Sequence, residues 1–411
     1  MGNDRRVVVV GMGIRTPIGN TLDELVTSLK EGQSGIGRVP EWEGVKRLRT
    51  RLAGKCSISG QEEVIPRQHR RSMGRVALLA ALSALDAIKA SGLSEEEIAS
   101  PFCGVSYGST EGSIGSHMES IRKMLLDQSL EGIPASWYLK CMSHTCAANL
   151  SILFHTRGPF IASCTACVSG SQGIGFGYEA IKAGKADIMI TGGAEEVDFL
   201  SAAVFDLMMA TSSNYNDRPT ESPRPFDEHR DGLVVSEGAG TLILEEYEHA
   251  QKRGAPILGE IEGYWTNSSG NHLTNSDARS MEECILGALK DARRSASEME
   301  HVNAHATATS QGDEIEALVT HKIFGETIPV SSLKGHMGHT MGASGAIEAI
   351  ATFLMMKDAF MAPTLNLEKP DQTLPPLNHV IGAPRDQGFK VGISNNFAFG
   401  GVNTSLILTL V

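Results

Sequence analysis

Short strand-like runs alternate with amphipathic segments along the whole of this 411-residue chain. Residues 6–12 form an apolar run typical of a buried strand, and residues 21–30 and 71–91 have the periodicity of amphipathic helices, the first capped by Asn20 or Thr21. Further strand-like runs occupy residues 105–108 and 187–191. This alternation predicts an α/β fold.

Two similar hairpin patterns divide the chain. Residues 231–246 read as two apolar runs separated by a Gly-rich turn, and residues 391–410 repeat the pattern at the C-terminus. Each hairpin pattern comes at the end of a stretch with the same order of elements, namely a strand, a loop that contains a cysteine or a histidine, and a helix. The repeat predicts two related halves, residues 1–252 and 253–411, joined near residues 251–255.

Cys167 is the candidate nucleophile. It follows the apolar run at residues 160–162 and precedes a segment of small residues compatible with a helix. We expect a strand, a tight elbow and a helix that begins at the cysteine. The positive end of the helix dipole and its free N–H groups would then favour the thiolate. The competing interpretation is a small buried residue, as most cysteines are.

Two histidines favour the functional interpretation of Cys167. His305 and His339 each follow a strand-like run, at residues 299–303 and 327–331, and each lies in a loop of small residues that leads into a helical segment. Since loops at the strand ends of an α/β protein converge, we expect the three side chains to meet in one pocket, with the cysteine on the N-terminal half and both histidines on the C-terminal half.

Composition narrows the class of protein. The net charge of −12 argues against a nucleic-acid binder, and no apolar run is long enough to cross a membrane or to form a signal peptide. Seven cysteines, an odd number, suit a reducing compartment, so we expect a cytoplasmic protein. Cys164 and Cys167 form a C-x-x-C pair, but no second pair completes a zinc site. The Gly11-Met-Gly13 sequence lacks the third glycine of a dinucleotide fingerprint.

With these motifs in place, the whole chain resembles the β-ketoacyl-acyl-carrier-protein synthases of the elongating type. The segments that carry the resemblance are residues 165–170, 192–196, 224–232, 237–240, 303–305, 338–339 and 396–401, with Lys334. The resemblance implies a thiolase-like fold, with two similar halves in a five-layered αβαβα arrangement. It also implies a homodimer, or a heterodimer with a related subunit, and no cofactor or metal.

The family's residue roles transfer to matching positions. Cys167 would carry the acyl group as a thioester, with the backbone N–H groups of Cys167 and Phe399 as the oxyanion hole. His305 and His339 would promote decarboxylation of the malonyl unit, and its enolate would attack the acyl-cysteine. Lys334 and Glu348 match a pair that orients the histidines and tunes their charge. The competing interpretation of that pair is a purely structural buried ion pair.

Several positions depart from the family pattern. Ala306 and Ala398 replace glycines, the second between the gating residues Phe397 and Phe399. The facing loop, which ends at Thr274, has Ser269 where aspartate is usual, and Glu111 falls where a small or apolar residue lines the acyl pocket. These changes predict a specialised synthase, such as one of an aryl-polyene pathway.

The partner implied is an acidic acyl carrier protein, loaded with acyl or malonyl groups. A cluster of arginines lies where the family docks this partner: Arg67, Arg70, Arg71 and Arg75. The competing interpretation is a solvated helix face. Another docking position is occupied by Asn214, with Arg218 close by.

Two other functions stay open at this point. A chain-length factor, the non-catalytic relative, would lack the nucleophile that this chain has in Cys167. A thiol oxidoreductase would use Cys164 together with Cys167. Replacement of Cys164 by serine distinguishes the two functions, because a condensing enzyme should keep its condensation activity without Cys164.

Overall fold

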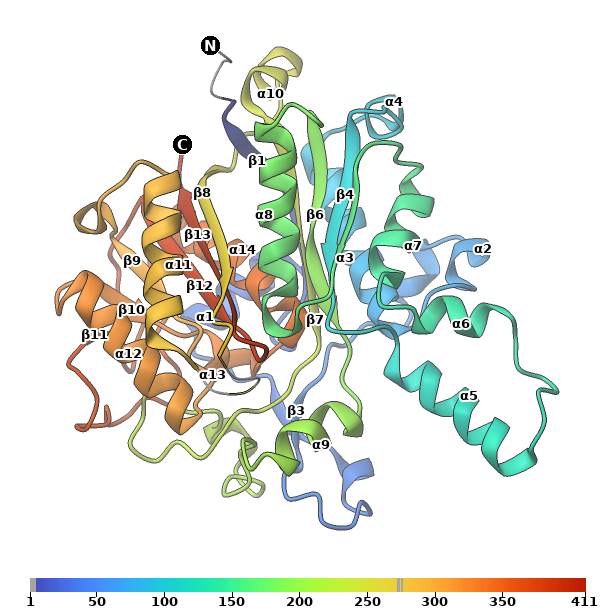
Figure 1. The fold of residues 1–411 in the computed structure, drawn as a ribbon, viewed down its shortest axis with the longest axis horizontal. Helices are drawn as coiled ribbons and strands as arrows, with labels where there is room; N and C mark the ends of the chain where they lie inside the picture. The colour runs from blue at the N-terminus through green and yellow to red at the C-terminus, as the bar shows by residue number, and fades with distance from the viewer. Residues whose placement is uncertain (1–4, 272–273, 275) are drawn as a thin grey trace.

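A mixed sheet runs through the whole molecule (Figure 1). The computed structural model describes residues 5–271, 274 and 276–411; residues 1–4, where we expect no signal peptide, lie outside the described residues. In sheet order the strands are β5 (Phe160–Ser163), β4 (Cys103–Gly108), β6 (Ile188–Glu195), β7 (Gly238–Glu246), β1 (Val7–Arg15), β8 (Gly259–Ser268), β13 (Val402–Thr409), β12 (Val391–Phe397), β9 (His301–Asn303), β10 (Pro329–Ser331) and β11 (Asn378–His379). Strands β2 (Ile36–Arg38) and β3 (Leu52–Gly54) form a separate pair.

The two halves of the sheet have the same strand order. In the first half, β5, β4 and β6 are parallel, and β7 and then β1 follow antiparallel. In the second half, β10, β9 and β12 are parallel, and β13 and then β8 follow antiparallel. The halves meet where Val7–Val9 of β1 pair with residues 259–261 of β8. The repeat expected from the sequence is therefore present in the topology.

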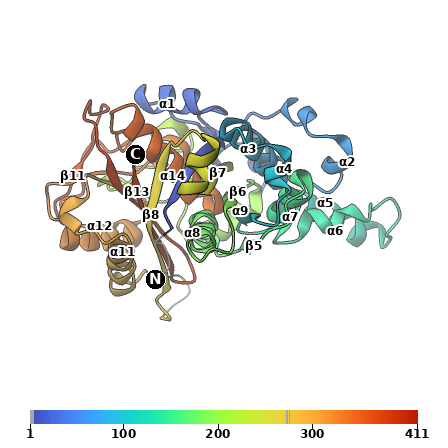
Figure 2. The ribbon, with the colours of Figure 1, turned by 90° about the horizontal axis from the view of Figure 1, so that it is seen from above.

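Helices form three layers around the two half-sheets. Helices α8 (Ser169–Lys182) and α14 (Ser344–Lys357) lie between them (Figures 1 and 2). Helices α3 (Arg75–Ser91) and α7 (Thr145–Phe154) cover the outer face of the first half, and α11 (Ala278–Asp291) and α12 (Ser310–Phe324) that of the second. Every residue of α14 except Lys357 is buried, as expected of a helix enclosed on all sides. The predicted α/β thiolase-like fold is confirmed.

Eight further helices are described. They are α1 (Leu22–Lys30), α2 (Arg67–Arg70), α4 (Glu95–Ile98), α5 (Ile114–Asp127), α6 (Ser136–Cys141), α9 (Phe199–Leu207), α10 (Tyr247–Arg253) and α13 (Lys334–Met337). The predicted start of α1 is confirmed, because Thr21 and Glu24 form a reciprocal capping box. Within the described residues, none of the helices combines the length and the apolar character that a bilayer span requires.

Two local predictions were wrong. Residues 231–246 are not a hairpin, because only β7 is a strand and it pairs with β1 and β6. Residues 232–236 instead run beside other loops, with Leu233 bridged to Thr211 and Val235 to His339. The helix predicted over residues 71–91 begins only at Arg75, because Arg71 ends the short helix α2 and the extended backbone of Gly74 separates the two helices. The C-terminal hairpin is confirmed as β12 and β13.

Candidate active site

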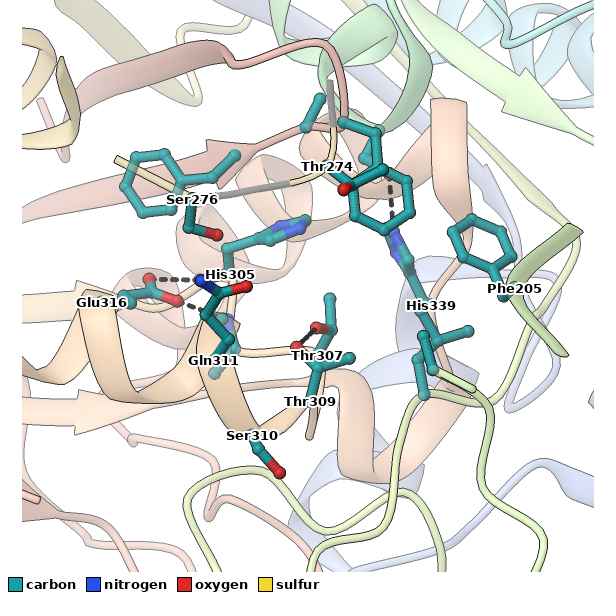
Figure 3. Close-up of a pocket in the computed structure, with 18 of the residues that line it drawn as sticks. Phe205, Thr274, Ser276, His305, Thr307, Thr309, Ser310, Gln311, Glu316 and His339 are labelled. Atoms are coloured by element: carbon teal, nitrogen blue, oxygen red, sulfur yellow. Dashed lines mark hydrogen bonds between the residues drawn. The ribbon is translucent and has the colours of Figure 1, made fainter. Parts of the chain in front are cut away.

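Cys167, His305 and His339 line one cavity of about 530 Å³. All three side chains are buried, and their sulfur and ring-nitrogen ligand atoms lie within 4.8 Å of one another. Figure 3 shows both labelled histidines pointing into the cavity from different sides. The structure therefore brings together the three residues that the sequence singled out, from loops after β5, β9 and β10.

The elbow at Cys167 differs in detail from the prediction. Residues 166–168 form a 3₁₀ turn in which Ala166 has a φ of 51°, and α8 begins only at Ser169. Burial raises the pKa of the Cys167 thiol to about 12, although Lys334 and the backbone N–H groups of Cys167 and Phe399 act to lower it. The helix end is expected to favour the thiolate, and burial acts in the opposite direction by favouring the neutral thiol in the free protein.

His339 is held on both sides of its ring. Its Nε2 lies 2.9 Å from Cys167 Sγ, and its Nδ1 lies 3.0 Å from Ser344 Oγ. Its backbone N–H donates to Val234 O at 2.8 Å, and its carbonyl accepts from the N–H of Ser236 at 2.9 Å. The segment wrongly predicted as a hairpin arm is therefore the support that positions this histidine.

His305 is fixed mainly through its backbone. The carboxylate of Glu316, on α12, accepts hydrogen bonds from the N–H groups of His305 at 2.7 Å and Ala306 at 2.6 Å (Figure 3). The ring lies 5.2 Å from that of His339, nearly perpendicular to it, and its Nδ1 is 3.4 Å from Asn396 Nδ2. The two imidazoles thus approach the same space at different angles.

A buried ion pair lies behind the histidines. Lys334 Nζ donates to Glu348 Oε1 at 2.6 Å, and the other carboxylate oxygen accepts from Asn396 Nδ2 at 2.6 Å. Burial and the nearby Lys334 ammonium hold the pKa of His305 and of His339 well below the usual value. Both imidazoles are therefore neutral at physiological pH, so they can act as N–H donors without carrying a charge.

The Phe-Ala-Phe segment closes one side of the cavity. Phe397 and Phe399 both line it, and the Phe399 ring lies 5.6 Å from that of Phe205. The backbone N–H of Ser269 donates to Gly401 O at 2.8 Å, so the two predicted gating loops touch. Ala398 keeps an ordinary negative φ, and the positive φ values fall on Gly400 and Gly401. Alanine at position 398 is therefore accommodated without strain.

The remaining predicted residues are divided between cavity and surface. Thr274 lines the cavity, whereas Glu111 is exposed on the single chain. Partial burial and the carboxylates of Glu196 and Asp198 raise the pKa of Glu111. The cavity lining contains neither Glu111 nor its neighbours.

The arginine cluster is not uniform. Arg67 and Arg71 are exposed, and Arg70 is half-buried. Arg75 Nε instead donates to the buried carboxylate of Glu237 at 2.7 Å, and its Nη2 donates to Cys56 O at 2.8 Å. The Arg75 side chain stays 41% exposed, but its guanidinium is paired with a buried carboxylate, which distinguishes it from Arg67 and Arg71.

Sequence reasoning missed three supporting residues. Ser344 orients His339, Glu316 anchors the His305 backbone, and Asn396 links Glu348 to His305. Asn396 belongs to a motif that carried the resemblance, but nothing in the sequence indicated its partners. Glu316 is one of several acidic residues on an ordinary helix, so no local signal distinguishes it.

The fold and the site define a thiol-histidine-histidine enzyme of the thiolase-like class, and comparison with known proteins identifies the family. Residues 4–250 match the β-ketoacyl synthase N-terminal domain, and residues 258–368 match the C-terminal domain. The chain is 35% identical to 3-oxoacyl-[acyl-carrier-protein] synthase 1 of Haemophilus influenzae, over 98% of both chains. It therefore belongs to the β-ketoacyl synthase family.

Solved structures agree with this assignment. A β-ketoacyl synthase from Burkholderia phymatum superposes with a TM-score of 0.96 and 44% identity, over 99% of this chain and 100% of the other. A type II PKS ketosynthase, solved in complex with its acyl-carrier protein and bound to the hexaketide, gives a TM-score of 0.89 and 27% identity over 100% of both chains. The relatives thus include ketosynthases of fatty acid and of polyketide synthesis.

Proposed function

We propose that this protein condenses an acyl thioester with malonyl-acyl-carrier protein and releases carbon dioxide and a β-ketoacyl-carrier product. The observation that carries the proposal is the contact of 2.9 Å between Cys167 Sγ and His339 Nε2, with His305 in the same cavity. A buried thiol with an adjacent neutral imidazole is suited to acyl transfer. A non-catalytic chain-length factor would not need this contact.

In the first half-reaction, Cys167 Sγ attacks the thioester carbonyl of the acyl-carrier. The proton of the thiol passes to His339 Nε2 and from there to the departing carrier thiol. The backbone N–H groups of Cys167 and Phe399, which act to lower the pKa of the thiol in the free protein, stabilise the oxyanion of the tetrahedral intermediate. The products are the acyl-cysteine thioester and the free carrier.

In the second half-reaction, His305 and His339 donate N–H groups to the malonyl thioester carbonyl. The bond to the carboxylate breaks, carbon dioxide leaves, and the enolate carbon attacks the acyl-cysteine carbonyl. The C–S bond of the acyl-cysteine then breaks, and the departing Cys167 thiolate takes up one proton from solvent. Ser344 suits both half-reactions, because its hydroxyl accepts from or donates to His339 Nδ1. Either tautomer of His339 is thus satisfied, so Nε2 serves as an acceptor in the first step and a donor in the second.

Lys334 and Glu348 act behind the imidazoles in this scheme. Burial, aided by the ammonium, lowers the pKa of both rings, and the carboxylate holds the ammonium and Asn396 in place. A neutral imidazole is the better partner for a thiol that must give up its proton, and it still donates an N–H to the enolate oxygen.

An acidic carrier protein is the partner we propose, docked on α2 through the exposed Arg67 and Arg71. The curated relative is named for this carrier, and the related polyketide ketosynthase binds one.

The departures at Ala306, Ala398, Ser269 and Glu111 support a specialised pathway of the aryl-polyene kind. Seven free cysteines support a cytoplasmic location. The common strand order supports a division into residues 1–252 and 253–411.

We also propose a dimer. Strand β5 lies at an edge of the sheet, and Phe160 on it is 48% exposed. An uncovered apolar edge strand favours pairing with a second chain. Sedimentation should give twice the chain mass of 43.9 kDa, either from two copies or from one copy with a related subunit.

The test is the intact mass of the protein after incubation with a panel of acyl-carrier thioesters. The wild-type chain should gain one acyl group, and Cys167→Ala should gain none. Cys164→Ser is the matched control, since Cys164 is the exposed neighbouring thiol, and it should acylate like wild type. Undiminished acylation of Cys167→Ala would contradict the proposal, and loss in Cys164→Ser would favour a thiol oxidoreductase.

A further inference from the structure

We infer that the cavity also binds a single Zn²⁺ ion through Cys167, His305 and His339, and that zinc reversibly blocks the enzyme. One thiol and two imidazoles are a ligand set that Zn²⁺ prefers. They are the one group of histidine, cysteine and carboxylate side chains with metal-ligand spacing among the residues that the structure describes. The inference does not depend on the proposed reaction.

The geometry is close to a zinc site but not preformed. With Zn–S near 2.3 Å and Zn–N near 2.1 Å, tetrahedral ligands stand about 3.6 Å apart. Here Sγ and His339 Nε2 are 2.9 Å apart, and all separations lie within 4.8 Å. The three ligand atoms therefore have to shift by about 1 Å to reach tetrahedral spacing. The cavity leaves space for water as the fourth ligand.

The surroundings support metal binding at two further points. Zinc-bound histidines commonly use the second ring nitrogen for a hydrogen bond that fixes their orientation. His339 has this arrangement, since Nδ1 bonds to Ser344 Oγ while Nε2 faces the thiol. The nearby Lys334 ammonium is paired with Glu348 at 2.6 Å, so the site does not add an uncompensated positive charge to that of the metal.

Binding replaces the thiol proton by the metal. The Cys167 S–H bond breaks, an S–Zn bond forms and one proton is released. His339 keeps its N–H on Nδ1, which faces Ser344 Oγ. A zinc-bound sulfur cannot attack a thioester, and an acylated sulfur cannot bind zinc. Zinc and the acyl group should therefore exclude each other.

Cobalt provides the direct test, because Co²⁺ bound to a thiolate absorbs in the near ultraviolet. Titration of the full-length protein with Co²⁺ should produce this thiolate absorption band, which should reach its maximum at one Co²⁺ per chain. Addition of Zn²⁺ should then displace the Co²⁺ and remove the band. The band should vanish in Cys167→Ala and persist in Cys164→Ser. Ser344→Ala should bind Zn²⁺ about 10- to 100-fold more weakly, as loss of an outer-shell hydrogen bond does. Thermal unfolding of each variant without metal checks that it folds.

A second readout is protection of the thiol. Zn²⁺ should slow alkylation of Cys167 by iodoacetamide, and EDTA should restore the rate. Absence of the thiolate band from wild type, or equal Zn²⁺ affinity in wild type and Cys167→Ala, would overturn the inference. Neither result bears on acylation of Cys167, so the proposed function would stand or fall separately.

Discussion

Cys167 is subject to opposing influences that only the structure reveals. The sequence correctly placed it beside an elbow and two histidines, and the positive end of a helix predicted a thiolate. Burial of the side chain acts in the opposite direction and raises the pKa of the thiol to about 12. Desolvation depends on residues far apart in the sequence, so no local pattern could have indicated it.

This pKa predicts how the free protein reacts with iodoacetamide. Because the thiolate is the reactive form and its fraction rises with pH below the pKa, the alkylation rate of Cys167 should climb about tenfold per pH unit between about pH 6 and pH 9. The rate is measured by peptide mass spectrometry over a short pH series. A plateau below about pH 8 would show instead that the dipoles outweigh burial.

His305 should be needed for decarboxylation alone, whereas His339, which accepts the thiol proton in the first half-reaction, should be needed for both steps. Loss of one oxyanion donor typically costs about 10²–10³ in rate, so His305→Ala and His339→Ala should release carbon dioxide from malonyl-carrier that much more slowly. Acylation of Cys167 should survive in His305→Ala and survive only in part in His339→Ala. The control is His117→Ala, an exposed histidine outside the cavity. Normal carbon dioxide release by either active-site variant would refute these roles.

Helices α8 and α14 hold the active-site loops against each other through small residues. A Cβ on Gly345 would lie 2.5 Å from Ser171 Cβ and 2.6 Å from Asn396 Oδ1. The sequence showed segments rich in small residues but not which ones touch. In the same way, residues 232–236 had the pattern of a strand, yet they pair with the His339 loop instead of forming a hairpin. Such pairings are tertiary, and apolar periodicity does not encode them.

Gly345→Ala should therefore damage both stability and activity. Overpacking of this kind costs about 1–3 kcal/mol, and here it presses on Asn396, which supports His305 and Glu348. Denaturant unfolding measures the loss. The matched control is Gly44→Ala, where a Cβ meets nothing within 4 Å. Equal stability of the two variants would mean that the helices can move apart at no cost.

The short helix α2 tests the docking proposal. Charge pairs at an interface rim mainly set association rate and salt dependence, so Arg67→Glu with Arg71→Glu should raise KM for acyl-carrier substrates and flatten the response to salt. Activity on a small acyl thioester should hardly change. Lys290→Glu, on the exposed face of the distant helix α11, is the control. Equal loss on both substrates would assign these arginines to the fold.

At the scale of the molecule, most of the design was predictable. The α/β class, the repeat and the convergence of Cys167, His305 and His339 follow from alternating patterns and from loops at strand ends. The residues that contact and position these three side chains could not be predicted. Glu316, Ser344 and Arg75 find their partners through the fold, and the partner of Arg75 is the buried carboxylate of Glu237.

The most direct test is the complete reaction with acyl-carrier and malonyl-carrier, followed by mass spectrometry of the carrier. The account predicts a carrier-bound product lengthened by two carbons with a β-keto group, one carbon dioxide for each product, and no product from Cys167→Ala. Acyl transfer to Cys167 with no lengthened product from any chain in the substrate panel would contradict decarboxylative condensation as the function of this protein.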